Sequence, residues 1–403
     1  MAAFPEPVAA PNVITDPYMK RFLPLALALP FLIPAASAST PSFDAKAPVA
    51  YMVDLSSGRV LFDRDGARQM PPASMAKMMT THVAFKLIKE GKLRLDQTFT
   101  MRPETWRKWH SQGSTMFLKV DEAVSVENLL HGIVTLSGND ACVVLAEGIS
   151  GSEEAFADLM NAEARRLGLT GSHFGNSSGW PDEGVTQVTA RDLAVLAKAT
   201  IEETPDLYQQ FYATPSFTWG ETMGGTPIVQ ANRNPILGRV AGADGLKTGH
   251  TQEAGYGFTG SAVQNGRRLI MVVAGLTSER ERTAESVRLL DWGFRAWQAR
   301  PIAKKGAVLG QAKVQGGWAR SVDLVVPRDL SATIPAAANG KLSGKIVYDG
   351  PIKAPIAQGQ EIARLVVDAG DGVAQSLPLV AGKEVAQAGF FGRLWIGFLS
   401  LFG

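Results

Sequence analysis

Ser74 and Lys77 have the types and the spacing to do chemistry together. They lie in Ser74-Met75-Ala76-Lys77, just after two prolines, where a helical pattern begins. A spacing of three places the serine hydroxyl and the lysine amine on one helix face, within hydrogen-bond reach. The lysine could act as the base for the serine if burial or nearby cations lower its pKa from about 10.4 toward neutrality. Alone, the pattern also fits a helix-capping serine followed by a surface lysine.

Two further motifs add to this pair. Ser137-Gly138-Asn139 falls in the break between helical patterns at 126–136 and 141–149, where its side chains can point into a cleft. Lys247-Thr248-Gly249 precedes a predicted strand pair, and there Lys247 would offer a cation to a carboxylate while Gly249 would let a substrate backbone approach closely. Together, in this order, the three motifs indicate one active site.

The trio resembles the S-x-x-K, S-D-N and K-T-G signature of class A β-lactamases and penicillin-binding proteins. Residues 40–298 resemble the serine β-lactamase and transpeptidase fold. The whole mature chain resembles the low-molecular-mass penicillin-binding proteins of the D-alanyl-D-alanine carboxypeptidase type-five group, in peptidase family S11. The strings that carry the resemblance are residues 72–80, 137–142, 244–251 and, for a closing helix, 289–294.

The resemblance implies a role for each catalytic residue. Ser74 would be acylated and Lys77 would take its proton. Ser137 would relay a proton to the leaving amine, and Asn139 would hold the substrate's peptide. The oxyanion hole would be the backbone N–H groups of Ser74 and of His250.

The same resemblance implies how a substrate's terminal carboxylate would bind. Lys247 and Thr248 would hold it, beside Gly249, and Arg282 would support its recognition. The stretch Ser278–Glu281 adds acidic groups next to Arg282 and is a departure from the family pattern.

The expected function is a serine-type D-Ala-D-Ala carboxypeptidase that acts on peptidoglycan pentapeptide stems and is covalently inhibited by β-lactams. An endopeptidase is a variant, although the short stretch between Ser74 and Ser137 leaves no room for a large inserted domain. A β-lactamase is an alternative, but the E-x-x-L-N string of class A enzymes is absent, even though Glu183, Glu202 and Glu203 lie between the second and third motifs. A non-enzymatic penicillin-binding sensor or scaffold is the third possibility. The sequence leaves rates, affinities, stem specificity and oligomeric state open.

The elements that must position these residues predict an α/β (α+β) catalytic domain over 39–298. A hairpin at 48–63 and a strand pair at 256–263 and 268–274 flank the helical patterns, which include 74–90, 153–167, 190–202 and 281–297. Strands at both ends with helices between them predict a sheet that joins the two ends. The short apolar runs after Pro301 predict a small all-β domain over 299–385.

The two ends of the chain carry targeting signals. Residues 1–38 have the basic, apolar and Ala-x-Ala parts of a signal peptide, with cleavage after Ala38 and a start at either Met1 or Met19. Residues 386–403 predict an amphipathic helix with Trp395 at a membrane interface. A tail that docks on its own protein is the alternative. We therefore expect a peripheral protein on the periplasmic face of the inner membrane.

Composition excludes several classes. Forty basic against 38 acidic residues leave no footprint for nucleic acid. The five histidines are scattered and Cys142 is the single cysteine, so we expect no metal, no cofactor and no disulfide within the chain. Cys142 is interpreted as a small buried hydrophobe. The G-x-S-x-G match at 175–179 is not interpreted as a nucleophile elbow because a loop pattern follows it.

Overall fold

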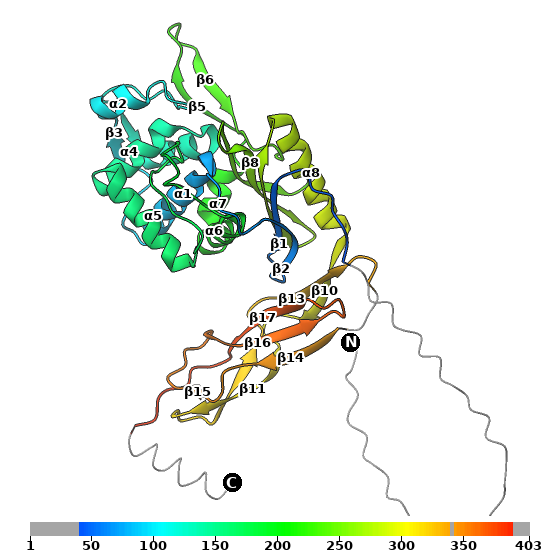
Figure 1. Cartoon of the computed structure of the whole chain (residues 1–403). Coiled ribbons are helices and arrows are strands. Elements are labelled where there is room, and N and C mark those ends of the chain that lie inside the picture. Colours follow the sequence, from blue (N-terminus) through cyan, green and yellow to red (C-terminus); the bar gives the residue numbers. More distant parts are fainter. Residues whose placement is uncertain (1–39, 339–341, 390–403) are drawn as a thin grey trace, which may run out of the picture. The chain divides into compact units, whose positions relative to one another are not determined.

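The computed structural model describes residues 40–338 and 342–389 (Figure 1). The predicted signal segment and residues 390–403 of the predicted anchor lie outside the described residues. In the part of the chain that the structure describes, no helix is long and apolar enough to cross a membrane.

A five-stranded antiparallel sheet forms the frame of the first domain. Its strand order is β2-β1-β9-β8-β7, so that the N-terminal hairpin pairs with strands that come about two hundred residues later, as the sequence predicted. The bounds are β1 Val49–Asp54, β2 Arg59–Arg64, β7 Ala243–Thr251, β8 Gly255–Gln264 and β9 Arg267–Leu276. Lys247 was expected ahead of the strand pair but lies within β7, a third strand at the edge of the sheet.

Both faces of this sheet are covered. Successive residues of β9 point to opposite faces: Ile270 and Val272 belong to one apolar core, and Leu269, Met271 and Val273 belong to another. The first core is shared with the helices between β2 and β7, and the second with α8, which packs on β8 and β9 (Figure 1). A strand that is buried on both faces has a continuous run of apolar residues in its sequence, and β9 has such a run.

The helices of the first domain include those the sequence predicted and two that it did not, α2 and α7. Their bounds are α1 Lys77–Lys89, α2 Pro103–Trp109, α3 Val126–His131, α4 Asn139–Ser150, α5 Glu153–Leu167, α6 Ala190–Glu203, α7 Pro205–Tyr212 and α8 Glu279–Arg295. Helix α1 is buried on every side from Lys77 to Phe85. Any charged group on this stretch must therefore find partners inside the protein.

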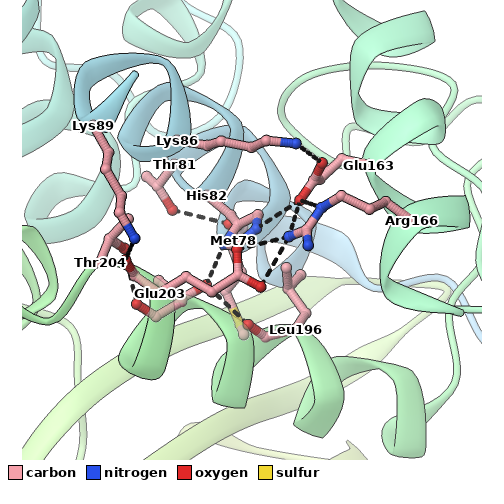
Figure 2. A network of polar contacts seen from close by, with 11 residues as sticks. Met78, Thr81, His82, Lys86, Lys89, Glu163, Arg166, Leu196, Glu203 and Thr204 are labelled. Atoms are coloured by element: carbon pink, nitrogen blue, oxygen red, sulfur yellow. Dashed lines mark hydrogen bonds and ion pairs between the residues drawn. The ribbon is translucent and has the colours of Figure 1, made fainter. Parts of the chain in front are cut away.

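His82 lies on this stretch and belongs to what we call the carboxylate cluster: His82, Lys86, Glu163, Arg166 and Glu203. Figure 2 shows Glu163 of α5 accepting hydrogen bonds from His82 (3.0 Å), Lys86 (2.6 Å) and Arg166 (2.7 Å), while Arg166 also reaches Glu203 at the end of α6. The ligand atoms of His82, Glu163 and Glu203 lie within 4.8 Å of one another, but Lys86 and Arg166 already neutralise the two carboxylates. The cluster ties α1 to α5 and α6.

Two small two-stranded sheets complete the first domain, and eight strands follow α8 in the part of the chain that the structure describes. One pairs β3 Thr98–Thr100 with β4 Ala123–Ser125, and the other is a hairpin of β5 Ser216–Glu221 and β6 Pro227–Ala231. The later strands are β10 Trp297–Ala303, β11 Val308–Gln315, β12 Ser321–Val325, β13 Leu330–Pro335, β14 Ser343–Val347, β15 Ile352–Lys353, β16 Glu361–Asp368 and β17 Ala374–Ala381. They form a six-stranded sheet and a two-stranded sheet around their own apolar core, the all-β domain expected after Pro301.

Candidate active site

Ser74 lies in a single 3-10 turn, Ala73–Ala76, immediately before α1. The sequence predicted a helix from Ser74, but the α-helix itself begins at Lys77 because Ala73 holds a positive φ of 47° after the two prolines. A side chain at Gly179 would meet the carbonyl oxygen of Ala73 at 1.9 Å. The glycine therefore lets a distant loop press directly against the serine turn.

Lys77 is fully buried and makes three contacts, all with uncharged groups. Its Nζ lies 2.8 Å from each of Ser74 Oγ, Asn139 Oδ1 and the carbonyl oxygen of Ser178. Burial, with a further contribution from Arg233, lowers the pKa of Lys77 to about 8. The amine is thus within hydrogen-bond distance of the serine hydroxyl and is partly neutral near physiological pH.

Ser137 ends the π-helical turn Gly132–Leu136, with a left-handed φ of 64°. The predicted helix 126–136 is therefore an α-helix only to His131, and the left-handed backbone of Ser137 ends the turn that follows. Its hydroxyl accepts a hydrogen bond from Lys247 Nζ at 2.9 Å. Burial, together with the nearby Lys77 and Arg233, holds the pKa of Lys247 well below its ordinary range.

Asn139 joins the serine turn to a loop, residues 112–118, that covers one side of the site. We call it the covering loop. Its Oδ1 accepts from Lys77, its Nδ2 donates to the carbonyl of Gln112 at 2.9 Å, and its backbone N–H donates to the carbonyl of Ser114 at 2.7 Å. Asn139 is buried, so these bonds satisfy groups that water cannot reach.

Strand β7 brings Thr248, Gly249 and His250 beside the serine turn. Among the described residues, β7 pairs only with β8, so its outer backbone groups remain available to another extended chain. A methyl group at Gly249 would lie 2.6 Å from the carbonyl oxygen of Pro72. This glycine therefore lets β7 pack against the serine turn. The His250 ring stacks on Tyr256, with ring centroids 3.8 Å apart.

Arg282 lies in the first turns of α8 and is buried. Its guanidinium stacks over the Tyr256 ring and donates to Glu279 at 3.0 Å, while its buried Nε has no hydrogen-bond partner among the described residues. Glu279 belongs to the acidic stretch noted in the sequence. Glu279 accepts a hydrogen bond from the Arg282 guanidinium, which would otherwise be free to donate it to a ligand's carboxylate.

Arg233 is a site residue that the sequence analysis missed. It follows the β5–β6 hairpin, its guanidinium donates to Ser114 Oγ, and its charge acts on both active-site lysines. No motif surrounds it. The only available signal was a lone basic residue in a loop ahead of the Lys247 motif, which is too common to be informative.

The sequence-predicted residues meet at one cleft of about 390 Å³. It is lined by Ser74, Ser114, Ser137, Arg233, Thr248, Gly249, His250, Tyr256, Glu279 and Arg282. Lys77, Asn139 and Lys247 lie immediately beneath the two serines and contact them or each other. We refer to Ser74, Lys77, Ser137, Asn139 and Lys247 as the active-site cluster.

Two weaker sequence signals lie outside this chemistry. Cys142 is buried, and burial raises the pKa of its thiol to about 12, so it is not a thiolate nucleophile at neutral pH. Ser177, the central serine of the G-x-S-x-G match, is buried and donates its hydroxyl to Glu153 at 2.6 Å. Its loop supports α1 instead, because the Ser177 carbonyl accepts from Thr80.

This arrangement can perform acyl transfer. It offers a hydroxyl nucleophile with a base of lowered pKa, a second serine and lysine pair, and a cationic end lined by arginines. Such a site suits a substrate that carries an anionic end next to an amide or ester carbonyl.

Comparisons with known proteins agree with this chemistry. Residues 35–278 match the family described as D-alanyl-D-alanine carboxypeptidase, and residues 297–387 match the C-terminal domain of penicillin-binding protein 5. D-alanyl-D-alanine carboxypeptidase DacC from Escherichia coli K12 is 35% identical over 360 residues, 88% of either chain. DacA from Haemophilus influenzae is 33% identical, over 85% of this chain and 86% of its own.

Solved structures show the same likeness. Penicillin-binding protein 5 from Haemophilus influenzae aligns with a TM-score of 0.74 at 32% identity, covering 86% of this chain and 99% of that one. Penicillin-binding protein D2 from Listeria monocytogenes, in its ampicillin-bound form, aligns with a TM-score of 0.54 at 28% identity, covering 63% of this chain and 99% of its own. The chain therefore belongs to the D-alanyl-D-alanine carboxypeptidase family of penicillin-binding serine peptidases.

Proposed function

We propose that this chain removes the terminal D-alanine from peptidoglycan pentapeptide stems through an acyl-enzyme on Ser74. The observation that carries the proposal is the 2.8 Å contact between Lys77 Nζ and Ser74 Oγ, in surroundings that lower the pKa of the amine to about 8. A buried lysine with only uncharged hydrogen-bond partners is suited to accept a proton.

Acylation follows from this contact. Neutral Lys77 takes the hydroxyl proton as Ser74 Oγ attacks the carbonyl of the D-Ala–D-Ala peptide bond. The backbone N–H groups of Ser74 and His250 stabilise the oxyanion. As the intermediate collapses, Ser137 relays a proton to the leaving amine, and free D-alanine departs. Water then hydrolyses the ester and regenerates the serine.

The cationic end of the cleft selects the substrate's terminal carboxylate. Lys247 and Thr248 bind it on β7, and Arg282 supports it from α8, with Asn139 holding the substrate's peptide group. The contact between Arg282 and Glu279 makes this chain's carboxylate subsite less positive than Lys247 and Arg282 alone would make it. A β-lactam carries a carboxylate next to a strained amide, which explains covalent inhibition at the same serine.

The test is D-alanine release from a diacyl-Lys-D-Ala-D-Ala tripeptide by wild-type protein and by Ser74→Ala. We expect steady release that the substitution abolishes, and a penicilloyl adduct that mass spectrometry maps to Ser74. Folded wild-type protein that releases no D-alanine would contradict the proposal. Rapid penicillin turnover without D-alanine release would favour a β-lactamase, and acylation without turnover of either would favour a sensor or scaffold.

We further propose that the protein is exported and acts on the periplasmic face of the inner membrane, held there by residues 386–403. The support is the signal-like segment 1–38 and the apolar stripe around Trp395. Deleting residues 386–403 should move the protein from the membrane fraction to the soluble periplasmic fraction. A truncated protein that stays with the membrane would contradict the role of this segment.

A further inference from the structure

Asp140 follows Asn139 directly, yet the chemistry above does not use it. It lies in the first turn of α4 and is fully buried. None of the ion pairs found among the described residues includes it. A buried carboxylate without a cation must be satisfied by hydrogen bonds.

All of the hydrogen bonds that the structure gives Asp140 come from backbone N–H groups. Met116 donates to both of its oxygens at 3.0 and 3.1 Å, Leu118 donates to Oδ2 at 3.2 Å, and Ala141 donates to Oδ1 at 2.9 Å. Two of these donors lie more than twenty residues earlier in the chain, in the loop that covers the site. Burial raises the pKa of Asp140, and these amide donors oppose that rise.

The loop is shaped to bind an anion. Phe117, between the two donors, has a left-handed φ of 63°, so the N–H groups of Met116 and Leu118 converge on one point. The Phe117 side chain is 54% exposed, whereas Met116 and Leu118 are buried. Packing of the Phe117 ring therefore does not explain its backbone conformation. The carboxylate of Asp140 occupies the concave backbone site that this conformation creates.

The same loop forms part of the active site. Its Ser114 lines the cleft and accepts from Arg233, and its Gln112 and Ser114 carbonyls accept from Asn139, which also contacts Lys77. Two consecutive residues, Asn139 and Asp140, thus hold one loop from the start of one helix. Space is tight there, since a methyl group at Gly138 would lie 2.9 Å from Asp140 Oδ1.

We propose that Asp140 is a positioning residue: by binding the backbone of residues 116–118, its carboxylate fixes the covering loop so that Asn139 and Lys77 keep their reactive geometry. This inference rests on the proposed function for its kinetic consequences, but the loop itself can be observed without any substrate. Misplacing a catalytic group by about 1 Å costs on the order of a hundredfold in rate.

The first test compares Asp140→Asn with Asp192→Asn in the full chain. Asp192 is a matched control because it too lies in the first turn of a helix, is buried, and accepts from a loop, at Gly171 N (2.9 Å) and Ser172 Oγ (2.7 Å). Neither aspartate lines the cleft. An asparagine offers one acceptor oxygen where the aspartate offers two, and its NH₂ group would face N–H donors.

We expect Asp140→Asn to raise amide hydrogen exchange at residues 112–118 by about tenfold or more. We also expect it to lower the second-order rate of acylation by a fluorescent penicillin by roughly 10- to 100-fold, well below its melting temperature. Asp192→Asn should change neither quantity, whatever its effect on stability. Unchanged acylation in Asp140→Asn would overturn the proposal, and so would an equal loss of acylation in Asp192→Asn.

The second test disrupts the same contact from the loop side, in case Asp140→Asn does not fold. Phe117→Val places a β-branched residue where φ is positive and should lower acylation, while Phe117→Gly fits that φ and should retain it. Equal acylation by these two variants would contradict the proposal. A wild-type protein that releases no D-alanine but binds penicillin would overturn the proposed function alone, because exchange and acylation still test the loop.

Discussion

Lys77 and Lys86 lie on the same helix, α1, but face different partners. Lys77 contacts only uncharged groups, and burial lowers its pKa to about 8. Lys86 contacts the carboxylate of Glu163 at 2.6 Å. Burial opposes ionisation of Glu163, yet hydrogen bonds from His82, Arg166 and Lys86 hold its pKa well below the ordinary range.

This contrast shows how one helix supports both reactivity and stability. In the active-site cluster, burial lowers the pKa of both lysines, other cations lower it further, and no carboxylate is in contact to oppose this, so that protons leave the lysines readily. In the carboxylate cluster, Lys86 and Arg166 each contact a carboxylate, so charge holds the helices together. Burial and the absence or presence of a facing carboxylate, and not the residue type, separate the two roles.

Lys77→Met should have the largest effect of any change to these two clusters. We expect acylation by a fluorescent penicillin to fall by about a thousandfold or more, since the serine loses its base. Lys86→Met is the matched control and should acylate at the wild-type rate, although with lower stability. A Lys77→Met protein that acylates within tenfold of wild type would show that Lys77 is not the base.

Glu163→Gln should do the reverse and affect stability rather than activity. It removes the carboxylate that His82, Lys86 and Arg166 share, although Arg166 keeps its contact with Glu203, and we expect a loss of about 2 kcal/mol in urea unfolding. The acylation rate in the folded protein should stay the same. Glu202→Gln is the control, because Glu202 is solvent-exposed and 3.9 Å from Lys198.

The loss of stability in Glu163→Gln should depend on pH. The pKa of Glu163 is depressed in the folded state, so its contribution is present above the unfolded value of about 4.3 and is lost as pH falls further. The stability difference between wild type and Glu163→Gln should therefore shrink below about pH 4. A difference that stays constant to pH 3 would mean that charge is not its source.

The pH–rate profile tests the active-site cluster in the same way. Lys77 must be neutral to accept a proton, so the second-order rate constant for acylation should rise with pH and level off above the lysine's pKa of about 8. Between pH 6 and pH 7 the increase should be about tenfold. A rate that is flat over this interval would contradict a buried lysine base.

The sequence predicted the members of the active-site cluster because each belongs to a short motif whose spacing carries the chemistry. Ser74 and Lys77 are three residues apart, and local structure alone brings them together. The pKa of Lys77 could not be predicted, since it depends on burial and on the charge of Arg233, both of which come from segments remote in the sequence. Arg233 itself had no motif.

The carboxylate cluster was not predicted for the same reason. His82, Glu163 and Glu203 lie on three helices, and no spacing relates them. The edge strand β7 was missed as a strand because Ala243–Thr251 contains two glycines and no regular apolar alternation. The other four strands of the sheet were predicted, and so was the joining of the two ends of the domain in one sheet, since those strands carry that alternation or a continuous apolar run.

Among these substitutions, we expect Arg233→Gln to have the smallest effect on acylation. It tests whether an uncompensated positive charge, as well as burial, lowers the pKa of the active-site lysines. The charge of Arg233 lowers the pKa of Lys77 and Lys247 with no carboxylate in contact to offset it. Removing it should raise both values and move the midpoint of the acylation profile to higher pH, by roughly half a unit. Arg233→Lys should keep the wild-type midpoint, and so should Arg239→Gln, which removes an exposed charge outside the cleft. A midpoint that does not move in Arg233→Gln, or that moves equally in Arg239→Gln, would mean that burial alone sets the basicity of Lys77.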